Sequence, residues 1–329
     1  MQAVVRTTSS RSTSFLKKAG YLATLFRQYQ IRAASNYGFA SVRSCVEEYA
    51  TLCEKYLGHG LRGCRVVEIG FGARPFRIAA LAAAGAKVYG VDLERPLLTL
   101  SLARIIDIAR TNGAERAVKS FFREICFGPG ERKAFEKEFD QSFASMIDKA
   151  KLHVANAADS EFWRKVGGDV DLIYSEDVIE HISPEDIERM CRNINKHVND
   201  GAVLLLRPNM YSGIVGGHIP EWYHTNVDRS NKKTRPWGHL SDGDVEPSVF
   251  LNKLSFADYK EMFSKYFEVL EANRSDFGLG RRLLTAEARQ RIPKEWSDED
   301  LLTNNVMFVL RNHGSLATKQ LSIDEARVS

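Results

Sequence analysis

Apolar residues along this chain are gathered in short runs, and amphipathic segments lie between them. Several runs end directly in a glycine or an acidic residue. A short apolar run bounded by turn residues is typical of a strand, and a continuously apolar strand is typical of a sheet covered on both faces. The pattern predicts strands within residues 66–69, 87–92, 169–175, 201–207, 268–272 and 304–310.

The glycine turn after the first of these strands carries the clearest signal for function. Glu68 and Gly70 end the strand, Gly72 follows, and a helical segment comes next. The second strand ends at Asp92, within the spacing of about 20 residues that nucleoside-binding units show. Glycine lets the backbone approach a ligand closely, and a carboxylate at the tip of the second strand can accept both ribose hydroxyls. The segment therefore predicts a nucleoside-binding half-site.

Two residues separate this turn from the dinucleotide-binding pattern. That pattern needs a third small residue where the pyrophosphate meets the helix, and Pro75 occupies the position. Glu68 adds a carboxylate, which suits a cationic or amine-bearing ligand better than a diphosphate. The Glu-x-Gly-x-Gly form of residues 68–72 resembles motif I of the class I S-adenosylmethionine (SAM) methyltransferases. The resemblance implies an enzyme, a SAM-dependent methyltransferase, with SAM as its cofactor.

Further segments follow in the order that this family shows. Residues 153–159 resemble its third strand and adenine loop, where either Asn156 or Asp159 would bond the adenine amino group. Residues 169–182 resemble its fourth-strand motif, in which an acid and an apolar strand precede a polar turn and a Glu-His pair. The resemblance assigns cofactor binding to Glu68, Gly70, Gly72, Asp92, Leu93, Asn156, Ala157, Asp159 and Ser175.

The resemblance also implies the fold class, α/β, with a seven-stranded, mostly parallel, doubly wound sheet and an antiparallel last strand. We expect a basic helical N-terminal arm at residues 1–58, the methyltransferase domain at 59–312 and a polar tail at 313–329. Two insertions are expected within the domain, at about 97–151 and about 210–247.

The first insertion contains two segments with helical spacing, 97–109 and 132–150. Between them lies Phe127-Gly128-Pro129-Gly130, a composition typical of a turn. We therefore expect a helical excursion interrupted by a turn. It would serve as a lid or as a dimer surface, and the sequence favours neither.

The second insertion combines glycines, aromatic residues and histidines in a polar segment after a strand. Ligands of such sheets bind outside the carboxyl ends of the strands, so we expect this insertion to form the acceptor pocket. The alternative is a surface loop whose tryptophans, Trp222 and Trp237, fold back onto the core.

The arm is basic, since no acidic residue precedes Glu47. Its apolar residues recur at helical spacing, and three interpretations compete. The arm is a helix packed over the cofactor pocket, a helix on an anionic membrane surface, or a cleaved targeting peptide rich in Arg and Ser. The apolar residues concerned are Phe15, Leu22, Leu25, Phe26 and Tyr29.

Composition limits the classes of protein that are possible but does not identify the family. With 329 residues, 44% of them hydrophobic, the chain can bury one large α/β core. No apolar run approaches the roughly 20 residues of a membrane-spanning helix. The five scattered cysteines predict reduced thiols and a cytoplasmic protein, with membrane association through the arm as an option. A net charge of +4 is too small to predict a nucleic-acid partner, and the oligomeric state stays open.

Methyl transfer to a hydroxyl group needs a base to remove the proton, and histidine is the side chain best suited to this at neutral pH. We expect His181 or His218 to be this base, with His224 and His239 as further candidates. A histidine with a purely structural role is the alternative at each position.

Asp177, Glu180 and His181 suggest a different chemistry. Their spacing resembles the ligand set of the small-RNA 3′-end methyltransferases and the quinone-precursor O-methyltransferases, although Asp177 is shorter than the usual glutamate. On a helical start the three residues would share a face, and with His218 they would suit a divalent ion. A solvated acidic helix start is the alternative, and we expect no metal.

The function that we expect is methylation of an oxygen on a small-molecule, sugar or lipid-linked acceptor. The histidine-rich insertion favours oxygen, and residues 174–177 lack an Asn-Pro-Pro-Tyr-type motif of amino-group methylation. The alternatives are metal-assisted methylation of an RNA end or a quinone precursor, and a non-catalytic SAM-binding protein. Pro75 and Glu68 argue against a nicotinamide oxidoreductase.

Overall fold

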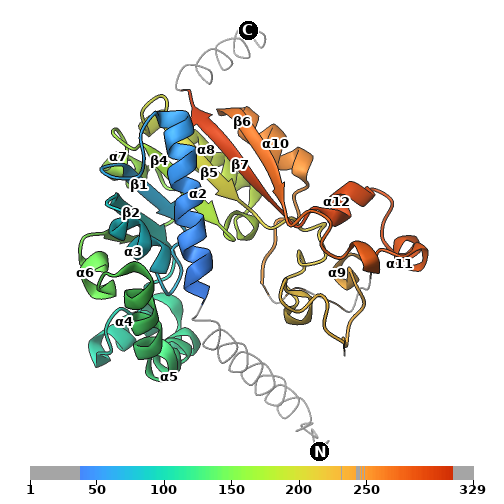
Figure 1. Ribbon diagram of the computed structural model, residues 1–329, viewed down its shortest axis with the longest axis horizontal. Coiled ribbons are helices and arrows are strands. Elements are labelled where there is room, and N and C mark those ends of the chain that lie inside the picture. Colours follow the sequence, from blue (N-terminus) through green and yellow to red (C-terminus); the bar gives the residue numbers. More distant parts are fainter. Residues whose placement is uncertain (1–37, 231, 242–244, 246, 248, 314–329) are drawn as a thin grey trace, which may run out of the picture.

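One seven-stranded sheet organises the computed structural model, which describes residues 38–313 except for 231, 242–244, 246 and 248. Its strand order is β3-β2-β1-β4-β5-β7-β6 (Figure 1). Strand β7 runs antiparallel to both neighbours, whereas the other pairs are parallel, so the predicted fold class is confirmed. The strands are β1 (Arg65–Ile69), β2 (Lys87–Asp92), β3 (Lys151–Val154), β4 (Leu172–Glu176), β5 (Val203–Arg207), β6 (Phe267–Ser275) and β7 (Asn305–Asn312).

Helices cover both faces of the sheet because alternate strand residues point to opposite sides. Val67 and Ile69 of β1 join the core beneath one layer, and Val66 joins the core beneath the other. The first layer consists of α7 (Ser160–Val166), α8 (Pro184–His197) and α10 (Phe256–Ser264). The second contains α2 (Phe39–Leu57), α3 (Phe76–Ala83) and α6 (Phe143–Asp148). Helix α10 begins with a capping box, in which Ser255 and Asp258 each bond the other's backbone N–H.

The predicted arm is described only from residue 38 onward. Its helix α2 buries Tyr49 and Cys53 in the second core. The apolar positions from Phe15 to Tyr29 and the tail beyond residue 313 lie outside the described residues. The three interpretations of the arm therefore remain predictions.

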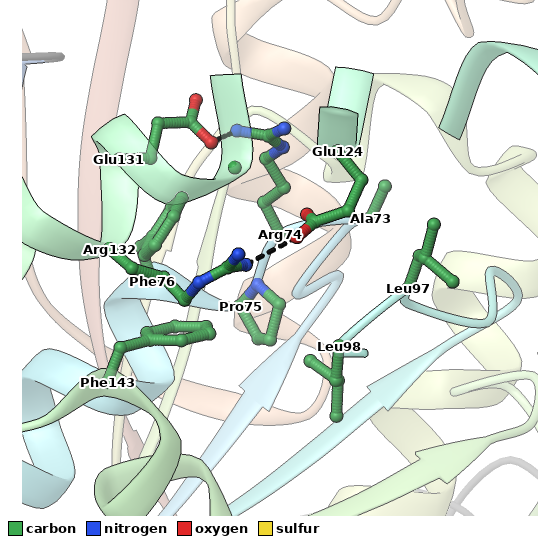
Figure 2. A pocket seen from close by; sticks show the side chains of 11 residues that line it. Ala73, Arg74, Pro75, Phe76, Leu97, Leu98, Glu124, Glu131, Arg132 and Phe143 are labelled. Atoms are coloured by element: carbon green, nitrogen blue, oxygen red, sulfur yellow. Dashed lines mark hydrogen bonds and ion pairs between the residues drawn. The ribbon is translucent and has the colours of Figure 1, made fainter. Parts of the chain in front are cut away.

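The first insertion is more helical than the sequence predicts. It forms α4 (Leu102–Asn112), α5 (Ala114–Phe139) and α6, and α5 runs straight through residues 127–130. The prediction of a turn there was wrong, because contacts in the folded chain override the local preference. Figure 2 shows two of these contacts: Glu131 pairs with Arg74 outside the helix, and Glu124 pairs with Arg132 within α5 at 2.5 Å. Gly128 faces the Glu124 carboxylate, where a Cβ atom would clash.

The second insertion packs with residues 276–302 into a separate small core. Trp222 and Trp237 are buried there, in a core separate from the two that flank the sheet. The lobe contains the short helices η3 (Pro220–Trp222), α9 (Gly238–Ser241), η4 (Arg281–Leu283), α11 (Ala286–Arg291) and α12 (Asp298–Leu302). Among the described residues, no helix is both long enough and apolar enough to cross a bilayer.

Candidate SAM and acceptor site

The glycine turn after β1 has a backbone geometry that only glycine adopts without strain. Gly70 has φ 82°, and a Cβ atom there would overlap the side chain of Val178. The Gly70 N–H donates to the carbonyl of Val91 at 2.8 Å, which ties the turn to β2. Gly72 has φ 66° and borders open space. The turn therefore leaves room for a ligand at the carboxyl ends of β1 and β2.

Asp92, at the tip of β2, is fixed by the same turn. One carboxylate oxygen accepts from the Gly72 N–H at 2.6 Å, and the other accepts from the Glu94 N–H at 2.6 Å. Partial burial raises the pKa of Asp92 to about 6, although the hydrogen bond from Gly72 and the charge of Arg116 oppose the shift. The carboxylate is thus held in place and ionised at neutral pH, as ribose recognition requires.

A cavity of about 750 Å³ opens in front of this turn, and we call it the cofactor cavity. Its size is in the range of small-molecule sites. Six of the nine predicted cofactor residues line it: Gly70, Gly72, Asp92, Leu93, Asn156 and Ala157. Residues that the sequence did not single out also line it, including Arg77, Glu94, Asn112 and Arg116.

The two adenine-loop candidates differ in position. Asn156 lines the cofactor cavity, and its Oδ1 accepts from the Ala158 N–H at 2.9 Å. Asp159 is exposed at the N-terminus of α7 and is not among the residues that line this cavity. The Trp163 indole fixes this loop, because its N–H donates to the Ala157 carbonyl at 2.7 Å. Of the two, Asn156 has the geometry for the adenine contact.

Ser175 and Glu68, the other two predicted cofactor residues, do not line the cofactor cavity either. The Ser175 hydroxyl is buried and donates to the Ile69 carbonyl at 3.0 Å, which joins β4 to β1. Glu68 is buried beside Arg77, whose Nε lies 3.5 Å away. Burial raises the pKa of Glu68 to about 7 against the opposing effect of this guanidinium.

Glu176, at the end of β4, is the centre of a buried charge group that sequence reasoning missed. It accepts from Arg77 at 2.6 Å, from Arg207 at 3.3 Å and from the Tyr49 hydroxyl of α2. The group links α2 and α3 to the strand ends beneath the site. In the sequence, Glu176 stands out only as a polar residue at the end of an apolar strand.

Asp177, the next residue, lies where three cavities meet. It lines the cofactor cavity, a histidine-side cavity of about 250 Å³ and an arginine-side cavity of about 440 Å³. The histidine-side cavity includes Asn209 and His218, and the arginine-side cavity includes Arg74. Asp177 has φ 57°, in the left-handed region, and such strain concentrates at functional sites.

His181 and His218, which were predicted separately, are brought together at this junction. Their ring centroids are 4.8 Å apart and nearly perpendicular. His181 Nδ1 lies 2.9 Å from the Phe250 carbonyl, which can only accept, so Nδ1 carries the proton and Nε2 the lone pair. His218 adopts φ 52°, and burial together with its neighbouring histidines lowers its pKa to about 4.

The other two histidine candidates occupy different environments. His239 is buried, and its Nε2 lies 2.8 Å from the Tyr211 carbonyl, so this nitrogen is engaged by the backbone. His224 lines the histidine-side cavity, with Nε2 3.0 Å from Asp276. His181 and His218 are the two of the four whose rings pack against one another.

The same junction contains a donor set for a cation. Ligand atoms of Glu180, His181 and His218 lie within 4.8 Å of one another. Glu180 is buried, its Oε2 has no hydrogen-bond partner, and burial raises its pKa to about 8. Asn209 donates to both Asp177, at 2.8 Å, and Glu180, at 2.7 Å, which brings the two acids together. One buried carboxylate and two imidazoles fit a divalent transition metal.

Similarity to known proteins points to one family. A model described as a methyltransferase domain matches residues 39–243. No curated protein sequence matches the chain.

Solved structures with similar folds include three methyltransferases. A TehB-like SAM-dependent methyltransferase from Corynebacterium glutamicum is 12% identical, with 85% of this chain and 99% of that one covered and a TM-score of 0.38. Magnesium protoporphyrin IX methyltransferase from Synechocystis is 14% identical, with 82% and 83% covered and a TM-score of 0.40. A SAM-dependent methyltransferase structure from Listeria monocytogenes is 13% identical, with 77% and 91% covered and a TM-score of 0.41.

Scores this low carry no argument about this chain, and the assignment rests on the family match. That match covers more than half of the chain and includes the glycine turn, Asp92 and the junction at Asp177. The cavity in front of the turn fits the SAM that the motifs predict. This chain belongs to the methyltransferase-domain family, the class I SAM-dependent methyltransferases.

Proposed function

We propose that this protein is an active methyltransferase that transfers a methyl group to an oxygen of a small-molecule, sugar or lipid-linked acceptor. The observation that carries the proposal is the meeting of the cofactor cavity with a histidine-lined cavity at Asp177. An acceptor in the histidine-side cavity would lie next to the cofactor and next to a base. Proximity of this kind removes much of the barrier of a two-substrate reaction.

The residues of the cofactor cavity each have a defined role in this proposal. Asp92 accepts hydrogen bonds from the ribose hydroxyls, and Asn156 lies next to the adenine. Gly70 has no Cβ atom, so its backbone leaves room for the ligand. When bound, SAM supplies a methyl group that its sulfonium has already activated. The protein then has to orient the acceptor hydroxyl and take its proton.

His181 is the better placed of the two candidate bases. Its Nδ1–H is committed to the Phe250 carbonyl, so Nε2 is the nitrogen that can receive a proton. The acceptor oxygen forms its bond to the methyl carbon as the carbon–sulfur bond breaks, and its proton passes to His181 Nε2. The pKa of His218 is lowered to about 4, so the ring stays neutral and its one N–H can donate to the acceptor oxygen while His181 takes the proton. His218 therefore orients the hydroxyl.

Transfer of an isotopically labelled methyl group tests this proposal. The acceptors are matched sets of glycosides and phenols with their deoxy and amino counterparts, and Asp92→Ala is the cofactor-binding control. Label found in the hydroxyl compounds alone supports O-methylation, whereas label in the amino compounds contradicts it. SAM binding by calorimetry without transfer to any acceptor would favour the non-catalytic alternative.

A metal-assisted reaction is the second candidate, because Glu180, His181 and His218 form a compatible donor set. A divalent ion there would bind the acceptor oxygen and lower the pKa of its hydroxyl group. Calorimetry with Mn²⁺ on wild type and on Glu180→Gln measures binding directly. Turnover that survives chelator treatment, without Mn²⁺ binding, would leave His181 as the base. Methylation of an RNA end or a quinone precursor would follow only from a metal-dependent outcome.

A further inference from the structure

The first insertion is built onto the loop that follows Asp92, and we call residues 93–95 the post-β2 loop. Helices α4 and α5 pack against each other as a hairpin at one end of the molecule (Figure 1). Leu97, just after the loop, is buried with Ile108 of α4 and Ala117 of α5 in a small core of their own. Burial of apolar surface is the main source of packing stability, so the hairpin and the loop are held together.

Asn112, the last residue of α4, fixes the backbone of the post-β2 loop. Its Oδ1 accepts from the Arg95 N–H at 3.0 Å, and its Nδ2 donates to the Leu93 carbonyl at 3.0 Å. Backbone groups outside a strand need partners of this kind, because a desolvated donor or acceptor without one costs free energy. A single side chain therefore bonds the loop on both sides of Glu94.

The side chains of the post-β2 loop contact the same hairpin. Arg95 pairs with Asp107 of α4 at 3.0 Å, and Glu94 pairs with Arg116 of α5. A fully exposed ion pair adds little stability, but these pairs are only partly exposed and act together with the Asn112 hydrogen bonds. All three loop residues are thus joined to the hairpin.

The post-β2 loop in turn holds the Asp92 carboxylate. One carboxylate oxygen accepts from the Glu94 N–H at 2.6 Å, so a shift of Glu94 would release this oxygen. Asn112 and Arg116 also line the cofactor cavity, as Asp92 does. The hairpin therefore reaches the cofactor cavity and fixes the backbone that orients its acid.

Charged residues around Asp92 come from three elements. They are Arg116 from α5, Glu94 from the loop itself and Glu68 from β1. Burial raises the pKa of Asp92, and the positive charge of Arg116 opposes this shift. A neutral side chain in place of Arg116 would therefore raise the pKa of Asp92 further.

We propose that the α4–α5 hairpin is an element of the SAM site, in which Asn112 positions the loop that follows Asp92 and Arg116 places a positive charge beside this acid. Asn112 is a positioning residue, because it acts on Asp92 through the loop. A loop that is already fixed in its binding conformation loses less conformational entropy when SAM binds. Both roles rest on Asp92 as the ribose acceptor of the proposed function, and neither depends on which compound is methylated.

Calorimetric titration of the full chain with SAM at pH 8 tests the role of Asn112. Asn112→Ala removes both hydrogen bonds to the loop, and we expect SAM to bind about tenfold more weakly. Thr111→Ala, at the exposed position one residue earlier on α4, is the matched control and should bind like wild type. Unchanged affinity in Asn112→Ala, while Asp92→Ala loses binding, would overturn the role of the hairpin and leave that of Asp92 intact.

A double-mutant cycle with Asp92→Ala shows whether Asn112 acts through the carboxylate. In the Asp92→Ala background we expect Asn112→Ala to weaken SAM binding less than about twofold, because no carboxylate is left to position. The same tenfold loss in both backgrounds would overturn the positioning role, since independent sites have additive effects. Equal SAM affinity of wild type and Asp92→Ala would overturn the ribose contact of the proposed function together with this role.

The pH dependence of SAM binding tests Arg116 by a measurement that a purely structural role would not change. Because Arg116→Gln raises the pKa of Asp92, its loss of affinity in acid should begin at higher pH. We expect SAM to bind this variant about threefold more weakly than wild type at pH 7 and nearly equally at pH 9. Arg104→Gln, at an exposed arginine of α4, is the matched control and should follow the wild-type profile. An equal loss at every pH, or no loss at any pH, would overturn the role of the Arg116 charge.

Discussion

The cofactor side and the acceptor side of Asp177 are built in different ways. On the cofactor side, Gly70, Gly72 and Asp92 lie close together in the chain, and backbone N–H groups fix the carboxylate. On the acceptor side, Asn209 and His218 lie in the loop after β5, and their side chains contact acids in the loop after β4. The first arrangement depends on local backbone geometry, and the second depends on long-range packing. Substitutions should therefore affect the two sides through different measurable quantities.

The largest effect is expected at Gly70. In Gly70→Ala the new methyl group meets Val178 in a backbone conformation with φ 82°, so the turn must move. Overpacking and left-handed strain together cost about 2–5 kcal/mol, and we expect SAM affinity in calorimetry to fall about 100-fold. Gly63→Ala is the control, because Gly63 has φ 85° but open space around it. Equal losses of affinity in both variants would mean that the close approach to the cofactor is not what Gly70 provides.

Replacing the two histidines should separate the acceptor side from the cofactor side. His181→Asn is expected to lower kcat about 100-fold or more, because it removes the proposed base. His218→Asn should lower kcat less, roughly tenfold, because it removes only a hydrogen bond to the acceptor. SAM affinity should stay unchanged in His218→Asn, because His218 lines the histidine-side cavity and not the cofactor cavity, which His181 does line. Loss of SAM binding in His218→Asn would contradict the division between the two sides.

Acid should weaken the cofactor side through Asp92, whose pKa is raised to about 6. The protonated acid cannot accept from both ribose hydroxyls, so only the ionised fraction binds SAM well. The apparent dissociation constant should then be nearly flat above pH 7 and rise about tenfold by pH 5. Asp92→Asn should bind weakly at every pH, without this dependence. A flat profile for wild type would show that Asp92 is not the ribose acceptor.

The smallest expected effect concerns Glu68, which touches Arg77 rather than the cofactor cavity. Its pKa is raised from 4.5 to about 7, so the folded protein keeps a proton that the unfolded chain releases. The stabilisation that this proton provides is complete below pH 4.5 and is lost as the pH rises through 7. Between pH 5 and 8 wild type should lose roughly 1–3 kcal/mol relative to Glu68→Gln, a difference of a few degrees in Tm.

Glu68→Gln also tests whether Glu68 belongs to the cofactor side. Unchanged SAM affinity in Glu68→Gln would make Glu68 a support for Arg77, whereas a tenfold loss would restore it to the cofactor side. Calorimetry at pH 8 distinguishes the two outcomes.

The sequence predicts most of the cofactor side because short-range patterns encode it. Positive φ values at Gly70 and Gly72 and a strand ending at Asp92 are properties of a few neighbouring residues. It could not separate Asn156 from Asp159, because both are polar and adjacent in one loop. It assigned Glu68 and Ser175 to the cofactor as well, and the structure places both outside the cofactor cavity, Glu68 beside Arg77 and Ser175 against the Ile69 carbonyl.

The helix through residues 127–130 is a feature that the sequence predicted wrongly. Glycine and proline at these positions favour a turn in isolation, but the segment is helical, and the buried Glu131 beside it pairs with Arg74. This contact joins residues far apart in the chain, and a local pattern carries no information about it.

By itself, the sequence determined the order of strands and helices, the glycine turn, the acid at Asp92 and the family to which these belong. Tertiary structure alone decided that His181 and His218 meet beside Glu180 and that Asp177 lines three cavities. The physical reason is the range of the interactions. Backbone conformation is set by neighbouring residues, whereas a site made of side chains depends on how distant segments pack.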